Sequence, residues 1–345
     1  MSFASNAVIA KVKAVCGHSL KREDYVQLSA KESVADVCAY LKQTERYGKA
    51  LASVNPQTVH RGQLEAMLRK AVFDTFERFH TFDHTESRVF FKYIVMQLEN
   101  EQVLSALQSV TSGVYVAYIA ALPMFLTEHS TVDLPALGLA KSYAEAAAIL
   151  QGTRFEKTVC PALAEAQTTG KLDICNVERT LYADYYMNML KDVEKNFKGA
   201  EKKDLKRLIL GVIDMKNVTT LYRYSRLFRA GTQNAKDALI PFKRRLSDDA
   251  IERLASLGDI SKVAAELDEI GYGLHSREIP ATVEQLTDKI SLDRLKKKLS
   301  LSQSSSVVYF AFMELLGQEL KNIKTIIEGI RYGLDGSAIL EMLVI

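Results

Sequence analysis

The sequence predicts an all-α protein that contains three copies of one helical unit. An acidic residue followed three positions later by an amide recurs three times within amphipathic helical patterns, at Glu99 and Gln102, Asp214 and Asn217, and Glu319 and Asn322. The spacing is 115 residues from 99 to 214 and 105 residues from 214 to 319. Only six prolines interrupt the 345 residues, which favours long helices. A repeated spacing of this kind is typical of a duplicated structural unit.

The beginnings of the units keep a similar spacing. Leu20, Tyr25 and Leu28 match Leu246, Ile251 and Leu254 at an offset of 226. At an offset of 109, Asp24 and Tyr25 match Asp133 and Leu134. Turn signals at Ala121-Leu122-Pro123 and Leu239-Ile240-Pro241 separate the copies. We therefore expect helical repeat units at residues 1–120, 121–235 and 236–345.

Several helix ends can be predicted from local signals. Ser247, followed by two aspartates, is expected to begin a helix as its N-cap. Gly333 is expected to end the last long helix in a left-handed conformation. The mixed-charge stretch Lys191–Arg207, with Gly199 inside it, is expected to be a solvated helix–turn–helix link. Lys296, Lys297 and Lys298 are expected to lie on a solvated face.

Composition and charge exclude several classes of function. The formal net charge of +3 gives no reason to expect nucleic-acid binding. Four widely separated cysteines, Cys16, Cys38, Cys160 and Cys175, favour a reducing, cytoplasmic setting without a disulfide framework. The N-terminus shows no secretory signal pattern. The apolar stretch from Val114 to Leu126 is shorter than the roughly 20 residues of a membrane span, so we expect a buried connector between units.

Patterns for catalysis and cofactor binding are absent from the sequence. It contains no phosphate loop, no GxGxxG, no HExxH and no GxSxG. His80 and His84 could share a helix face with Glu77, but the intervening sequence predicts a helix end, and we expect a solvated surface pair and not a metal site. Tyr182, Tyr185 and Tyr186 form a helical stripe that is expected to pack in a core. We expect no catalytic residue, no cofactor and no metal.

The recurring acid and amide lie on one helix face, beside the apolar stripe. Half-buried polar side chains must find hydrogen-bond partners, because unpaired burial costs about 1–3 kcal/mol each. We expect them to bind backbone groups or a basic side chain of a neighbouring helix, once in each unit. The set that defines this structural repeat motif is Glu99, Gln102, Asp214, Asn217, Arg223, Glu319 and Asn322.

These motifs resemble those of the C subunit of V/A-type rotary ATPases, the equivalent of the vacuolar d subunit. The segment from Glu319 to Ile327 is similar to the family's terminal ExxNIxxI motif, and Asp214–Arg223 is similar to its middle DxxNhxxhhR motif, where h is apolar. The stretch from Ile9 to Ala14 looks like the family's opening ARIRAM-like sequence, with lysines in place of both arginines. The chain departs from the family at Phe242-Lys243, where two glycines are usual, and at Leu316-Gly317, where many members have Lys-Glu.

The resemblance implies a funnel-like protein in which three similar helical bundles surround a pseudo-threefold axis. It implies a non-catalytic subunit, peripheral to the cytoplasmic face of the membrane and not spanning it. Its partners would be the central-stalk (shaft) subunits and the proteolipid of the membrane rotor ring, and it would carry torque between them in proton or sodium transport. The sequence alone does not identify the partner-binding residues.

Two other classes of protein fit an all-α chain. An all-α scaffold would bind partner helices or peptides, but such solenoids usually have repeats of about 34–47 residues. An all-α enzyme would need a polar pocket formed by only one of the three units. We therefore expect the rotor adaptor.

Overall fold

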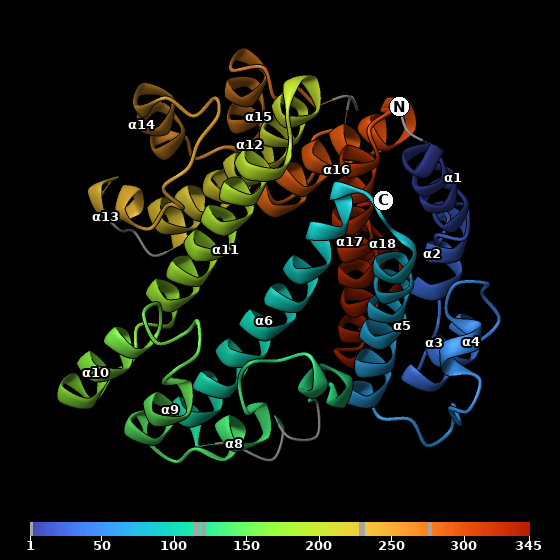
Figure 1. Ribbon diagram of the computed structural model, residues 1–345, viewed down its shortest axis with the longest axis horizontal. Helices are drawn as coiled ribbons and strands as arrows, with labels where there is room; N and C mark the ends of the chain where they lie inside the picture. Colours follow the sequence, from blue (N-terminus) through green and yellow to red (C-terminus); the bar gives the residue numbers. More distant parts are fainter. Residues whose placement is uncertain (1–2, 114–117, 119–121, 228–231, 275–277) are drawn as a thin grey trace.

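The computed structural model describes residues 3–113, 118, 122–227, 232–274 and 278–345. Within these residues all regular structure is helical and no strand occurs (Figure 1). The prediction of an all-α protein is confirmed.

Six long helices form the centre of the molecule. They are consecutive pairs, and each pair is joined by a short connection, so each pair is a helical hairpin. The helices are α5 (Arg61–Phe82) and α6 (Phe91–Ser112), α11 (Ile174–Asn196) and α12 (Gly199–Tyr222), and α16 (Val283–Leu301) and α17 (Ser305–Arg331).

Short helices precede each hairpin and lie outside it. In Figure 1 they form a blue group at the right, a green group along the bottom and an orange group at the upper left. We call these the first, second and third outer groups. The first is α2 (Arg22–Ser29), α3 (Val34–Leu41) and α4 (Gly48–Leu51); the second is α8 (Leu134–Leu139), α9 (Tyr143–Leu150) and α10 (Cys160–Thr169); the third is α13 (Thr232–Asp237), α14 (Asp248–Ser256) and α15 (Ile260–Glu269).

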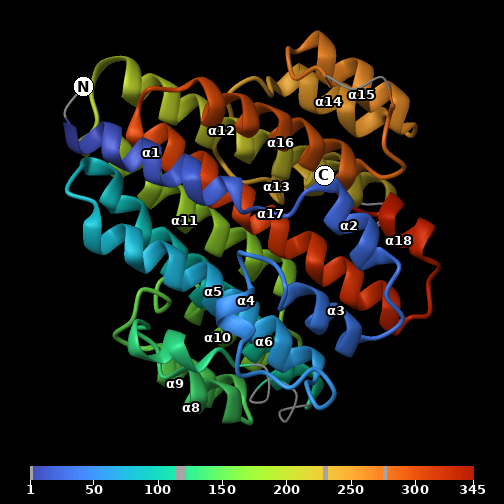
Figure 2. The same cartoon turned by 90° about the vertical axis from the view of Figure 1, so that its right-hand side faces the viewer.

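The remaining helices connect or cover these parts. Helix α1 runs alongside α17, which brings the first and last long segments of the chain together (Figure 2). Helix α18 packs on both α17 and α2. These elements are α1 (Phe3–Gly17), η1 (Glu86–Phe90), η2 (Met124–Glu128), η3 (Arg223–Leu227) and α18 (Gly336–Glu341).

An aromatic core fills the end of the bundle at which the hairpins turn. Phe79, Phe90, Phe197, Tyr309 and Phe310 are almost fully buried there. The Phe90 ring lies 6.0 Å from the Phe197 ring and 5.8 Å from the Phe310 ring, so the three hairpin ends are in direct contact. Buried aromatic side chains contribute more apolar area than any other type, and this core holds the six helices together.

Three smaller cores lie around the opposite end of the bundle. Each joins one outer group to the ends of two long helices. One joins the end of α6 to the second outer group and the start of α11. Another joins the end of α12 to the third outer group and the start of α16. The last joins α17 and α18 to the first outer group and the start of α5. Each outer group therefore packs against the second helix of one hairpin, and the hairpin that follows that group in the chain is a different one.

The structure confirms the helix boundaries that local signals predicted. Ser247 accepts a hydrogen bond from the backbone N–H of Ala250 at 3.1 Å as the N-cap of α14. Gly199, the first residue of α12, has a φ of +58° and lies within the expected helix–turn–helix link. Gly333 has a φ of +68° just after α17. Tyr185 and Tyr186 pack in the central core as expected, whereas Tyr182 is only partly buried.

The apolar stretch after Ser112 can be assessed only in part. Residues 114–117 and 119–121 lie outside the described residues, while Tyr118 and Leu122 are buried in the core of the second outer group. None of the described helices combines the length and apolar character that a membrane-spanning helix needs. All four cysteines are free thiols, in agreement with the expected lack of a disulfide framework.

Candidate functional site

The three recurring acids are buried in the second helix of each hairpin. The exposed fractions are 2% for Glu99 on α6, 0% for Asp214 on α12 and 5% for Glu319 on α17. Each carboxylate binds the outer group that packs against its helix. We call Glu99, Asp214 and Glu319, with their hydrogen-bond partners, the three carboxylate anchors.

The anchor at Glu319 joins the last hairpin to the beginning of the chain. Its carboxylate accepts hydrogen bonds from the backbone N–H of Leu20 at 2.9 Å and from the Tyr47 hydroxyl at 2.7 Å. Arg46 Nε lies 3.1 Å from Oε1, and the Arg46 side chain is only 4% exposed. A buried charge that is both paired and hydrogen-bonded avoids most of its desolvation cost.

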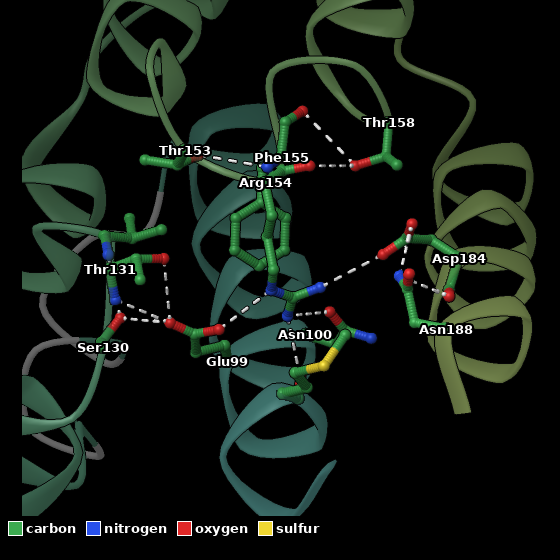
Figure 3. A network of polar contacts seen from close by, with 12 residues as sticks. Glu99, Asn100, Ser130, Thr131, Thr153, Arg154, Phe155, Thr158, Asp184 and Asn188 are labelled. Carbon is green, nitrogen blue, oxygen red and sulfur yellow. Dashed lines mark hydrogen bonds and ion pairs between the residues drawn. The ribbon is translucent and has the colours of Figure 1, made fainter. Parts of the chain in front are cut away.

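The anchor at Glu99 has the same composition (Figure 3). Its Oε1 accepts hydrogen bonds from the Ser130 hydroxyl and the Thr131 backbone N–H, both at 2.9 Å. Arg154 Nε donates to Oε2 at 3.0 Å and Arg154 Nη2 donates to Asn100 Oδ1 at 2.6 Å. The loop before α8 and the loop after α9 are thereby both fixed to α6.

The anchor at Asp214 uses no guanidinium. Oδ1 accepts from the Arg244 backbone N–H at 3.0 Å, and Oδ2 accepts from the Arg245 backbone N–H at 2.8 Å. The Tyr272 hydroxyl also donates to Oδ2. Burial and the neighbouring carboxylate raise the pKa of Tyr272 above its usual value, so this hydroxyl remains a donor at neutral pH.

A buried aromatic residue follows α3, α9 and α15, one in each outer group. These residues are Tyr47, Phe155 and Tyr272, with exposed fractions of 0, 0 and 1%. The residue before it is Arg46, Arg154 or Gly271, so two of the three copies place an arginine on the acid. Sequence reasoning missed these arginines and aromatics. The recurring Arg-aromatic pair at 46–47 and 154–155, in step with the acids, was the available signal.

The amides bind the chain that continues from each hairpin. Asn217 Nδ2 donates to the Ile240 carbonyl at 3.0 Å, and its Oδ1 accepts from the Ile240 N–H at 2.8 Å. Asn322 makes the same two bonds with Val344, at 2.7 and 3.2 Å. In the first hairpin, Asn100 and not Gln102 accepts a hydrogen bond from Arg154. Gln102 is buried, with an exposed fraction of 5%.

A cavity of about 1000 Å³ lies between the six long helices. All six contribute to its wall, and its inner part is formed by apolar side chains such as Phe73, Val212 and Met313. The charged lining residues are balanced, six acidic and six basic: Glu65, Glu101, Glu178, Glu284, Asp288 and Glu314, and Arg69, Arg179, Lys216, Arg223, Lys321 and Lys324. A balanced lining suits a protein partner of mixed charge and not a polyanion such as nucleic acid.

Arg223, the remaining residue of the predicted motif, belongs to this cavity and not to an anchor. Its side chain is 50% exposed, and its Nε donates to Glu284 Oε1 at 2.6 Å. This ion pair joins α16 to η3 along the cavity wall.

The family of this chain follows from a match that covers nearly all of it. The family model described as ATP synthase (C/AC39) subunit matches residues 8–342. The chain belongs to this family. The resemblance to the C subunit of V/A-type ATPases, and to the equivalent d subunit of vacuolar ATPases, is therefore confirmed.

Two relatives of this C/AC39 chain are each named as the C subunit of an A-type ATP synthase. The protein of Thermococcus onnurineus is 24% identical over 281 residues, which cover 80% of this chain and 70% of the relative. The protein of Pyrococcus furiosus is 21% identical over 327 residues, which cover 92% of this chain and 84% of the relative.

The histidine pair is separated by the predicted helix end. Helix α5 ends at Phe82, His80 stacks on Phe91 with 4.6 Å between ring centroids, and His84 is exposed. Burial lowers the pKa of His80, so this ring is neutral at physiological pH. Across the described parts of the C/AC39 chain, no group of three or more His, Cys, Asp or Glu side chains is arranged to hold a metal ion.

Glu314, in the cavity wall, is the one lining acid whose pKa is clearly raised. Burial raises it, and the nearby Lys216 only partly offsets this effect. A raised folded-state pKa means that burial penalises the ionised form, so stability is lost as the pH rises through this pKa. We expect Glu314→Gln to raise the melting temperature relative to the parent chain, and to raise it more at pH 7 than at pH 4.

The matched control for this prediction is Glu23→Gln on the exposed face of α2. Melting temperatures of all three proteins would be measured by circular dichroism across the pH range. The control is expected to show no such pH-dependent gain. A lower melting temperature for Glu314→Gln at pH 7 would mean that the ionised carboxylate is stabilising.

Proposed function

We propose that this protein is a non-catalytic adaptor of a V/A-type rotary ATPase that couples the central stalk to the membrane rotor ring. It would sit on the cytoplasmic face of the membrane as a peripheral protein and carry torque during proton or sodium transport. The observation that carries this proposal is the cavity of about 1000 Å³ between the six long helices, into which we infer that the end of the central stalk inserts. Family membership supports the same assignment.

We infer that the chain consists of three equivalent units, at residues 1–120, 121–235 and 236–345, around a pseudo-threefold axis. The three carboxylate anchors support this inference, because each binds an outer group through a backbone N–H and through a buried aromatic residue or the arginine before it. Each unit's second long helix binds the outer group of the next unit, and the third binds the first. Such closed docking gives a funnel that resists twisting, as torque transfer requires.

The predicted motif residues would then be structural repeats of this ring. Glu99, Asp214 and Glu319 would hold the outer groups, and Asn217 and Asn322 would hold the chain that follows each hairpin. Gln102 would take the corresponding place in the first unit. Arg223 would instead stabilise the cavity wall through its pair with Glu284.

The role of the cavity can be tested by filling it. Gly317 lies on α17 in the cavity wall, and a Cβ added there meets no atom within 4 Å. We expect Gly317→Trp to fold, because a helical glycine costs about 1 kcal/mol relative to other residues and its replacement brings no local clash. We expect it to lose at least about tenfold in affinity for the central-stalk subunits, because the side chain fills their binding space.

The matched control is Gly17→Trp at the end of α1, where an added Cβ also meets no atom within 4 Å but which does not line the cavity. Both tagged variants would be purified from native membranes with their partners. We expect the control to retain stalk and ring, and Gly317→Trp to retain the ring alone. Equal recovery of the stalk with both variants would exclude the cavity as its binding site. A parent chain that recovers neither stalk nor proteolipid would contradict the adaptor role itself.

A further inference from the structure

Three arginines lie near Tyr272, where the third outer group packs against α16. The guanidinium carbon of Arg294 lies 4.7 Å from the centre of the Tyr272 ring, and that of Arg245 lies 5.7 Å from it. Arg244, the neighbour of Arg245 in the chain, is close enough to both Tyr272 and Arg294 to shift their pKa values. None of the three arginines lines the central cavity.

The anchor at Asp214 does not need these guanidinium groups. Its carboxylate already accepts two backbone N–H bonds and the Tyr272 hydroxyl. At the other two anchors the arginine before the aromatic residue pairs with the acid, but here that position is Gly271. Arg245 Nη1 occupies the space of the missing side chain, 1.5 Å from where a Gly271 Cβ would be, and donates to the Ile270 carbonyl at 2.7 Å.

The cluster therefore carries more positive than negative charge. Arg244 Nη1 is buried and has no hydrogen-bond partner, and Arg294 makes no ion pair with any described residue. Asp293, which precedes Arg294 in the chain, pairs with Lys289 at 3.7 Å, and Asp248, three residues after Arg245, pairs with Lys243 at 2.6 Å. Burial lowers the pKa of Arg294, and the guanidinium groups of Arg244 and Arg245 lower it further, while Tyr272 and Asp214 act in the opposite direction.

We propose that Arg244, Arg245 and Arg294 form a binding site for a phosphate group. Three guanidinium groups beside one fully engaged carboxylate leave an excess of two positive charges, which matches a phosphate dianion. The planar guanidinium presents paired donors that fit phosphate oxygens. Arg244 Nη1 supplies a donor that is already desolvated and without a partner. The phosphate can come from a free anion or from a lipid headgroup, since both present the same oxygens.

The test compares the full chain with Arg294→Gln, which leaves every hydrogen bond of the Asp214 anchor in place. Thermal unfolding is followed in chloride, acetate and inorganic phosphate at equal ionic strength, so that general screening is held constant. We expect phosphate to raise the melting temperature of the parent chain more than acetate does. We expect Arg294→Gln to weaken phosphate binding at least about tenfold, and to melt no lower than the parent chain when phosphate is absent.

The matched control is Arg207→Gln, which removes an arginine with a 63% exposed side chain from α12, outside the cluster. It is expected to bind phosphate as the parent chain does. Co-sedimentation with vesicles of phosphatidylcholine, with and without phosphatidic acid, separates the two sources of phosphate. If the chain binds the acidic vesicles and Arg294→Gln weakens this binding, the ligand is a lipid headgroup. If the chain responds to inorganic phosphate alone, the ligand is a free anion. No phosphate response, an equal response to acetate, or equal binding by Arg294→Gln and Arg207→Gln would each overturn the site.

Discussion

Replacing Glu319 by alanine is expected to lower the free energy of unfolding by about 3–5 kcal/mol, because it leaves a buried cation without a partner. The Arg46 side chain is 4% exposed and has Glu319 as its ion-pair partner at 3.1 Å. The substitution also leaves the Leu20 N–H and the Tyr47 hydroxyl without their acceptor. Urea unfolding followed by far-ultraviolet circular dichroism would measure the loss.

An exposed ion pair provides the control for Glu319. Asp248, whose side chain is 79% exposed, pairs with Lys243, and Asp248→Asn is expected to cost far less than Glu319→Ala, because solvent screens an exposed ion pair. Adding Arg46→Met to Glu319→Ala should recover part of the loss, because the unpaired charge is then removed as well. A loss for Glu319→Ala as small as that of Asp248→Asn would contradict the anchor.

The position of Glu319 also predicts where the loss appears. Its bonds join α17 to Leu20 and Tyr47, residues 299 and 272 positions earlier in the chain. Hydrogen exchange in Glu319→Ala should therefore accelerate in α2–α4 before it does so in α8 and α9, which depend on the Glu99 anchor. Local opening of this kind precedes global unfolding in many proteins.

Much of the fold could be predicted because its signals are local. Helix beginnings at Ser247, turns at Gly199 and ends at Gly333 depend on residues within one turn of the site. The recurring acids could also be found, since each lies within one helix at a repeated spacing. Their position beside the apolar stripe predicted half-buried side chains, whereas the structure buries them more deeply, at exposed fractions of 0–5%.

The partners of the acids could not be predicted in the same way. Arg154 reaches Glu99 across 55 residues and Arg46 reaches Glu319 across 273, and no local pattern encodes such contacts. The amide that Arg154 binds was also not the predicted one. Arg154 donates to Asn100, one position after the acid, whereas the three-residue spacing had selected Gln102. The arginine cluster at Tyr272 depends on the space that Gly271 leaves for the Arg245 side chain. A single sequence shows the glycine but not which side chain fills the space beside it.

Replacing Asp214 by alanine is expected to cost about 3 kcal/mol or more, but through a different mechanism from Glu319. Two backbone N–H groups and the Tyr272 hydroxyl lose their acceptor, and each unsatisfied buried group costs about 1–3 kcal/mol. The substitution also removes the carboxylate that accepts from the backbone N–H groups of Arg244 and Arg245, within the cluster of Arg244, Arg245 and Arg294. Tyr272→Phe, which removes one hydroxyl, should cost only about 1 kcal/mol.

The difference between the two anchors can be measured with salts. Without Asp214 the three guanidinium groups lose a neighbouring negative charge that offsets their mutual repulsion, so sulfate or phosphate should restore more stability to Asp214→Ala than chloride of equal ionic strength does. Glu319→Ala should show no such preference, because its unpaired charge is a single enclosed arginine with bonds to Val15 and Ser19. Urea midpoints for both variants in each salt would decide the matter. An equal response of the two variants would mean that the excess charge at Tyr272 has no influence on stability.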